Sequence, residues 1–207
     1  MNLEQARYNM VEQQVRPWDV LDQQVLDLMQ NLPREAFVPD AYRNLAYADI
    51  EIPLEHEQTM LSPKLEGRIL QTLQLTPGDM VLEIGTGSGY LTALLAKLSG
   101  QVVSIDIHES FTRQVNQKLA QQHIENVTLH TGNAAQGWEQ SAPYDAIAVT
   151  GGLPELAATL KGQLKIGGRL FAVVGTGHIM EARLITRIAE QQWHTESLFD
   201  TYLSLLQ

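Results

Sequence analysis

An α/β fold, with a doubly wound and mostly parallel sheet behind an N-terminal helical extension, is predicted by two features of the 207-residue sequence. From residue 80 onward, short apolar runs typical of buried strands alternate with helical patterns. Between the first such strand and the following helix lie Gly85, Gly87 and Gly89. Strand, glycine turn and helix form the first crossover of nucleotide-binding sheets, whose ligands bind at the carboxyl ends of the strands.

Residues 1–75 are expected to form the extension. An N-terminal helical pattern is followed by a second one, which Asp19 or Asp22 could cap. Residues 31–63 contain four prolines and are expected to be loops and short turns. A helical pattern resumes over residues 64–75.

Residues 76–207 are expected to form a Rossmann-like core that joins the extension in one compact domain. Helices are predicted after the glycine turn and at residues 109–122, 154–162 and 179–190. Strands are predicted at residues 80–84, 101–106, 126–130, 144–150 and 168–174, with further strand material from Trp193 to Leu206.

The glycine turn predicts the kind of nucleotide. Glu83 precedes it, and Asp106 ends the next strand 21 positions after Gly85, the spacing at which an acidic residue receives ribose hydroxyls. No Lys or Arg occurs between Glu83 and Lys97, which argues against a phosphate ligand. The two acids suit a nucleoside with positive groups. We therefore expect S-adenosyl-L-methionine as cofactor and S-adenosyl-L-homocysteine as product.

Composition narrows the possible partners. The net charge of −10 disfavours a nucleic-acid partner. The chain lacks a long apolar run, so no membrane partner is expected, and its polar start and lack of cysteine favour a cytoplasmic protein. The six histidines lack ligand spacing, which predicts no metal site.

Segments along nearly the whole chain resemble the protein-L-isoaspartate O-methyltransferase family. They include Met10–Val15, Pro33–Pro39, Gln58–Thr59, Val81–Tyr90 and Gly167–Leu170. The resemblance implies a class I S-adenosylmethionine-dependent methyltransferase fold. It also implies methyl transfer to the α-carboxyl group of isoaspartyl residues, which starts the repair of damaged proteins.

The chain departs from the family pattern mainly on the acceptor side. Leu61 stands where the family has its active-site serine, and Glu57 replaces a glycine. Gly132–Ala134 replaces the family's Gly-Asp-Gly, and Gly151–Leu153 and Thr201–Leu205 also differ. The acceptor is therefore an isoaspartyl-type protein or peptide, or one that has diverged from it.

Candidate site residues follow from the loop and the resemblance. Thr59, Leu61 and Ser62 are the candidate catalytic positions, although the Thr59 hydroxyl could instead bond its own loop and Ser62 could instead cap a helix at Pro63. The acceptor pocket is expected from residues 55–63, 150–153 and 200–205. Candidate cofactor-binding residues are Glu83, Ile84, Gly85, Thr86, Gly87, Ser88, Gly89, Tyr90, Asp106, Ile107, Asn133, Ala134 and Thr150.

Three classes of function are compatible with these features. The first is an S-adenosylmethionine-dependent O-methyltransferase of the isoaspartyl type. The second is a regulatory or binding relative that keeps the cofactor but transfers little or no methyl, for which Leu61 and Asn133 are the support. The third is a nicotinamide oxidoreductase, which the spacing of the three glycines disfavours.

Overall fold

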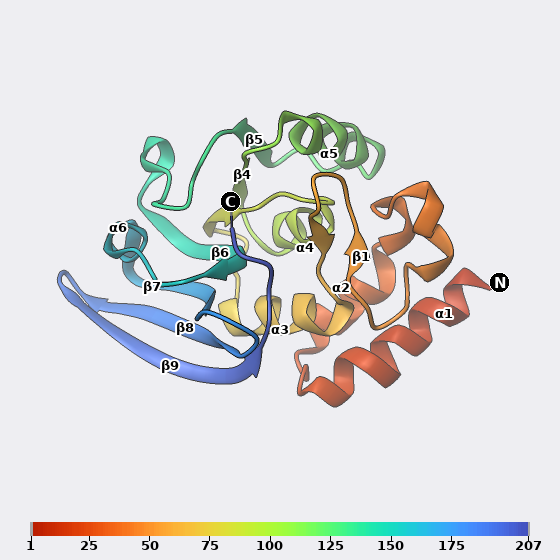
Figure 1. Cartoon of the computed structure of the whole chain (residues 1–207), viewed down its shortest axis with the longest axis horizontal. Helices are drawn as coiled ribbons and strands as arrows, with labels where there is room; N and C mark the ends of the chain where they lie inside the picture. The colour runs from red at the N-terminus through yellow and green to blue at the C-terminus, as the bar shows by residue number, and fades with distance from the viewer. Residues whose placement is uncertain (1, 207) are drawn as a thin grey trace.

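The seven-stranded sheet confirms the predicted fold class. The computed structural model describes residues 2–206, and its strand order is β5-β4-β3-β6-β7-β8-β9 (Figure 1). The first five of these are parallel, and β8 and β9 are antiparallel. The strands are β3 (Met80–Ile84), β4 (Gln101–Asp106), β5 (Val127–Thr131), β6 (Tyr144–Leu153), β7 (Leu164–Val174), β8 (Met180–Ala189) and β9 (Gln192–Thr201). Because the chain order reverses beside β3, a crevice for a ligand is expected at its carboxyl end.

Strand periodicity divides the core into two layers. Val81 and Val102 pack in a cluster with helices α3 (Pro63–Leu73), α4 (Tyr90–Leu98) and α5 (Glu109–Gln121). Leu82 and Val103 belong to a second cluster on the other face, which includes Leu160 of helix α6 (Ala158–Gly162). No helix within residues 2–206 is long and apolar enough to cross a membrane.

The N-terminal segments cover α3 and α4 on one side of the molecule (Figure 1). Helix α1 (Leu3–Met10) continues through a π-helical turn (Val11–Val15) and a 3-10 turn (Arg16–Trp18), and α2 (Gln23–Asn31) follows. Asp22 caps α2 by accepting the N–H groups of Gln24 and Val25. Further 3-10 turns (Arg34–Ala36 and Asp40–Leu45) lead to a short hairpin of β1 (Ile52–Pro53) and β2 (Thr59–Met60). Under this layer every residue of α4 except Lys97 is buried.

A buried ion pair within the extension also contacts the core. Arg34 and Glu66 are fully buried, and Arg34 Nη1 donates to the Glu66 carboxylate. Arg34 Nη2 donates to the Leu61 carbonyl oxygen at 2.6 Å, and its guanidinium carbon lies 4.9 Å from the Tyr90 ring centroid. Burial raises the pKa of Glu66 to about 7, which the Arg34 charge partly opposes. One guanidinium thus joins the extension, the loop before α3, α3 itself and the start of α4.

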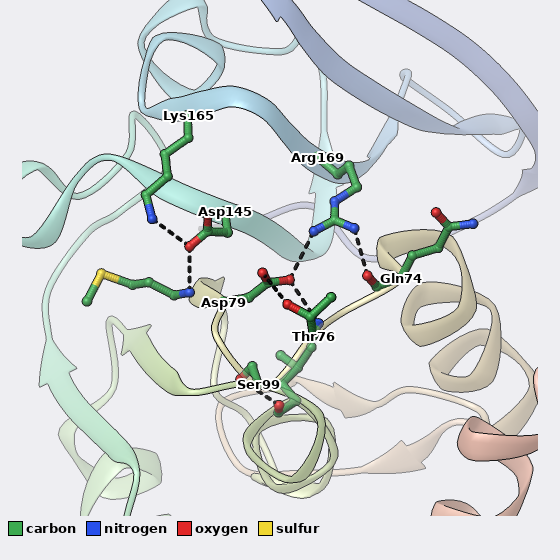
Figure 2. Close-up of polar contacts among 9 residues, drawn as sticks. Gln74, Thr76, Asp79, Ser99, Asp145, Lys165 and Arg169 are labelled. Carbon is green, nitrogen blue, oxygen red and sulfur yellow. Dashed lines mark hydrogen bonds and ion pairs between the residues drawn. The ribbon is translucent and has the colours of Figure 1, made fainter.

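A second polar cluster lies at the amino ends of β3, β6 and β7, the end of the sheet opposite to the expected ligand crevice (Figure 2). The Asp79 carboxylate accepts a bond from Arg169 at 3.0 Å. Asp145 accepts bonds from the Met80 N–H at 2.8 Å and from Lys165 at 2.7 Å. Each carboxylate is thus paired with a cation of β7, so the cluster at this end of the sheet has a structural role.

The helix predicted at residues 179–190 is wrong, because this segment is strand β8. Its Met, Glu, Ala, Arg and Leu residues favour helix as isolated residues. In the fold the segment pairs with β7 on one side and β9 on the other, and Met180 and Ala182 point into the core. Pairing on both edges therefore overrides local propensity. The helix predicted at 154–162 is confined to Ala158–Gly162.

Replacing Glu66 with alanine should lower the free energy of unfolding by about 3–5 kcal/mol, because it leaves the Arg34 guanidinium buried without its carboxylate. The matched control is Glu12→Ala, which breaks the partly exposed Glu12–Arg16 pair and should cost at most about 1 kcal/mol. Urea unfolding of both variants measures the difference. Equal, small losses would contradict a central role for the pair.

Candidate functional site

A cavity lies at the carboxyl ends of β3, β4 and β6, where the reversal of chain order places a ligand site. The glycine loop, the β1–β2 hairpin and the segment Leu203–Leu206 enclose it. Ten of the candidate site residues line it, namely Thr59, Leu61, Ile84, Gly85, Gly87, Asp106, Ile107, Asn133, Ala134 and Thr150.

The glycine loop is shaped by close backbone contacts. Gly85 has φ +96°, and a Cβ atom there would lie 2.2 Å from Thr150 Oγ1. The Thr150 hydroxyl contacts the carbonyl oxygens of Ile84 and Gly85 at 2.9 and 2.8 Å. Gly87 has φ +49° and leaves its backbone open to the cavity. A side chain at Gly85 would therefore displace β6, whereas a ligand can approach the backbone of the loop closely.

Asp106 presents a positioned carboxylate at the end of β4. One carboxylate oxygen accepts the Gly87 N–H at 3.0 Å, and the other accepts the His108 N–H at 2.9 Å. Each oxygen keeps a further lone pair for a donor in the cavity. Such a carboxylate suits the two hydroxyls of a ribose, and the apolar side chains of Ile84, Ile105 and Ile107 suit a flat base. The lining contains no Lys or Arg, so its donor set fits S-adenosylmethionine better than a phosphate ligand.

Glu83 lies beneath the loop, although the sequence suggested that it contacts the cofactor. Its side chain is fully buried and does not line the cavity. One carboxylate oxygen accepts the hydroxyls of Thr92 and Ser104 at 2.5 and 2.6 Å, and Ser104 shares a further bond with Thr86 at 2.6 Å. Burial raises the pKa of Glu83 to about 8. This network supports the loop from below by connecting β3, β4, α4 and the loop itself.

Five other candidate residues also lie outside the cavity lining, namely Ser62, Thr86, Ser88, Gly89 and Tyr90. Ser62 occupies the N-cap position of α3 without a capping side-chain bond. Tyr90 is fully buried, with its ring centroid 5.5 Å from that of Phe37. The Ser88 carbonyl accepts a bond from Lys118 at 3.1 Å. These residues hold the surroundings of the loop in place.

The β1–β2 hairpin is held against the first turn of α5. The His56 and His108 rings stack with centroids 3.9 Å apart at 6°, and Phe111 meets both rings edge-on. His56 Nε2 also lies 2.9 Å from Ser110 Oγ. In the connecting turn, His56 and Glu57 both have positive φ, which is strained for residues other than glycine. The stack therefore holds a strained turn over the cavity.

The C-terminal segment closes another side of the cavity. Leu205 forms a parallel bridge with Gly152, where the Gly152 N–H donates to the Ser204 carbonyl at 2.8 Å and the Leu206 N–H donates to Gly152 at 2.9 Å. Figure 1 shows this segment running from β9 back toward the end of β6. Each of the three segments expected to build an acceptor pocket contributes to the lining of this cavity. The lining residues are Gln58, Thr59, Leu61, Thr150, Gly151 and Leu203–Leu205.

Among the lining residues that sequence reasoning did not assign to the site are Ile105, Phe111, Gly132 and Leu206. For Phe111 a signal was available, because a large apolar residue one turn into the helix after Asp106 must lie near the carboxyl ends of the strands. Leu206 carries no such signal, because its placement depends on backbone pairing with Gly152. Within residues 2–206 no cluster of three or more His, Asp or Glu side chains could hold a metal ion.

The part of the cavity lined by Leu61 and the C-terminal segment has few free hydroxyl groups. The Leu61 side chain is apolar and nearly buried, and its carbonyl is already bonded to Arg34. The Thr59 hydroxyl donates to Glu51 at 3.0 Å, and that of Thr150 is directed at backbone carbonyls. Ser204 supplies the third hydroxyl of the lining. This end of the cavity is thus built to exclude water more than to bond a ligand through side chains.

Comparison with known proteins gives one consistent result. The family model for protein-L-isoaspartate (D-aspartate) O-methyltransferase matches residues 5–203. The chain is 40% identical to the protein-L-isoaspartate O-methyltransferase of Rhodopseudomonas palustris (strain ATCC BAA-98 / CGA009), over 92% of this chain and 88% of that protein. It is also 40% identical to the enzyme of the same name from Syntrophus aciditrophicus (strain SB), over 90% of this chain and 86% of that one.

Solved structures agree with this result. A protein-L-isoaspartate O-methyltransferase structure superposes with a TM-score of 0.83 at 25% identity, covering 99% of this chain and 65% of its own. A Plasmodium falciparum structure has the same TM-score at 21% identity and covers 100% of this chain and 99% of its own. That protein, a putative protein-L-isoaspartate O-methyltransferase, was crystallised with S-adenosyl-L-homocysteine. At 21% identity, this likeness is evidence for the fold alone.

Glu83 should make stability fall as pH rises. Its pKa of about 8 in the folded protein exceeds the ordinary value of 4.5. Between pH 4.5 and pH 8 the folded protein therefore binds this proton more tightly than the unfolded chain does. Replacing Glu83 with glutamine should remove this pH dependence. The free energy of unfolding of the natural protein, relative to Glu83→Gln, should therefore fall between pH 5.5 and 8 by up to about 1.4 kcal/mol per pH unit.

Urea unfolding of both proteins at several pH values measures this difference, and the exposed change Glu139→Gln serves as the control. A difference that stays constant across this range would show that Glu83 is ionised beneath the loop.

Proposed function

Because the chain belongs to the protein-L-isoaspartate (D-aspartate) O-methyltransferase family, we propose that it transfers a methyl group from S-adenosylmethionine to a carboxylate of isoaspartyl residues in proteins or peptides. One observation carries the proposal. A single cavity joins the glycine loop and Asp106 to an end built from three segments of the chain. Cofactor and acceptor can therefore meet in one enclosed space.

The cofactor end is assigned to residues of the loop and of the strand ends. Asp106 would receive the ribose hydroxyls, and the backbone at Gly85 and Gly87 would face the methionine part. The side chains of Ile107 and Ala134 would border the adenine. When bound, S-adenosylmethionine supplies a methyl group activated by its sulfonium. The absence of Lys and Arg from the lining suits that positive charge.

The acceptor end needs no general base, because a carboxylate is already ionised at neutral pH. What the protein must supply is alignment and the exclusion of water. Leu61, Leu203 and Leu205 line this end and would exclude water. Backbone N–H groups and the Ser204 hydroxyl remain to bond the carboxylate. Protein repair in the cytoplasm, without a nucleic-acid or membrane partner, stays a prediction for this chain.

Tritium transfer tests the proposal directly. Labelled S-adenosylmethionine is incubated with a peptide that contains isoaspartate and with the matched aspartyl peptide. We expect label in the first and none in the second. Tight cofactor binding without transfer to either peptide would favour the second class of function, a binding relative, for which the apolar Leu61 is the structural support.

Replacing Asp106 with asparagine should weaken cofactor binding about tenfold or more. The change removes the charge that strengthens bonds to the ribose hydroxyls, each worth about 1.5–3 kcal/mol. Calorimetry with S-adenosylhomocysteine measures the affinity, and the exposed change Asp27→Asn is the control. Unchanged affinity in a folded Asp106→Asn protein would remove this carboxylate from the cofactor site.

Replacing Leu61 with serine should raise turnover of an isoaspartyl peptide about tenfold. A hydroxyl facing the acceptor end can bond the acceptor carboxylate, whereas the leucine cannot, and a bond to a charged group contributes about 1.5–3 kcal/mol. Initial rates with labelled cofactor compare the two proteins. The control Leu61→Ala makes the same space without a hydroxyl. An equal gain in both variants would assign the effect to space alone.

A further inference from the structure

A second hollow in the surface lies beside the cavity, next to Thr59, Leu61 and Leu203. It is lined by Trp18, Asp49–Glu51, Lys64 and Tyr202, among others, and we call these residues the flank groove. Three links join it to the cavity. Ser62 of its wall follows Leu61, Tyr202 precedes Leu203, and Glu51 accepts the hydroxyl of Thr59. The residue beside an acceptor bound in the cavity would therefore lie close to the groove.

Large apolar side chains are exposed in the flank groove. Trp18, Ile50 and Tyr202 are 41%, 42% and 51% exposed, and all three line it. Phe199 meets the Trp18 ring edge-on at 6.3 Å and holds it in place. Such a cluster beside a site is typical of a surface that contacts a partner.

The groove also favours positive charge. Lys64 Nζ lies 4.5 Å from the centroid of the Trp18 ring, so an aromatic face of the groove already holds an ammonium group. Lys64 is itself neutralised by Asp49 at 2.9 Å. Among residues 2–206, Glu51 has no Lys or Arg within salt-bridge distance, and its carboxylate contacts the Thr59 hydroxyl. One negative charge is thus left over in the groove.

We propose that the flank groove binds the residue next to the isoaspartate of the acceptor and selects a Lys or Arg side chain there. This inference rests on the proposed function and names the class of acceptor. Glu51 would attract the cation, and the exposed Tyr202 ring would contact it and its aliphatic stem. An acidic neighbour would be repelled by Glu51. Because the groove is partly open to solvent, we expect about a three- to thirtyfold preference for Lys over Glu.

The experiment uses isoaspartyl peptides that carry Lys, Ala or Glu beside the isoaspartate, on one side and then on the other. The measured quantity is the ratio of kcat/KM for the Lys and Glu peptides. We expect Glu51→Gln and Tyr202→Ala to lower this ratio toward one while changing the Ala peptide less. Lys64→Gln should raise it, because the Trp18 face and Asp49 become free for the peptide.

Two controls separate the groove from other sources of charge. Glu57→Gln removes an exposed carboxylate of the hairpin tip that does not line the groove, and it should leave the ratio unchanged. High salt should reduce the ratio in the natural protein. Loss of the preference in Glu57→Gln, or its persistence in Glu51→Gln, would overturn the proposal, as would a ratio of one in the natural protein.

A binding measurement keeps this test independent of turnover. If no peptide is methylated, the proposed transfer to isoaspartate fails, and the affinity of the same peptides for the protein with S-adenosylhomocysteine is measured by fluorescence anisotropy. Tighter binding of the Lys peptide, lost in Glu51→Gln, would still support the flank groove. Equal binding of the Lys and Glu peptides would overturn it.

Discussion

The buried contact between Arg34 and Glu66 is the constraint on which the rest of the site depends. Its two charges lie out of water, so each relies on the other for compensation. The same guanidinium bonds the Leu61 carbonyl and packs on Tyr90, one residue after the last loop glycine. A shift of the segment that carries Arg34 relative to α3 would therefore separate a charge from its partner. Leu61 of the cavity lining and the start of α4 are held in a fixed relation as a result.

Around this anchor, the two ends of the cavity are built differently. At one end, the glycine loop lies beside the Asp106 carboxylate, whose position is set by the N–H groups of Gly87 and His108. The network at Glu83 supports that loop from inside the core. At the other end, Leu61 lies with the leucines of the C-terminal segment Leu203–Leu206. A polar end that orients one ligand and an apolar end that desolvates another suit group transfer between them.

The parts predicted correctly are those encoded by local patterns. The apolar run of β3, the glycine spacing and Asp106 at the end of β4 lie together in sequence and in space. Strand β8 was missed because pairing with two neighbours decides its structure. The position of Glu83 was available from strand periodicity, because it shares the α4 face of β3 with Val81. The C-terminal wall was foreseen through family resemblance, since no local pattern indicates pairing with Gly152.

The burial of α4 has a consequence for how such a chain can change in evolution. One face of this helix packs on the sheet, and its other apolar residues are covered by the N-terminal layer. A core released from residues 1–75 would expose those residues and would tend to self-associate. The layer is thus a poor candidate for exchange as a separate module, even though Gln58, Thr59 and Leu61 line the cavity. A single substitution in one of its loops, such as one at Leu61, would change the lining of the cavity without exposing the core.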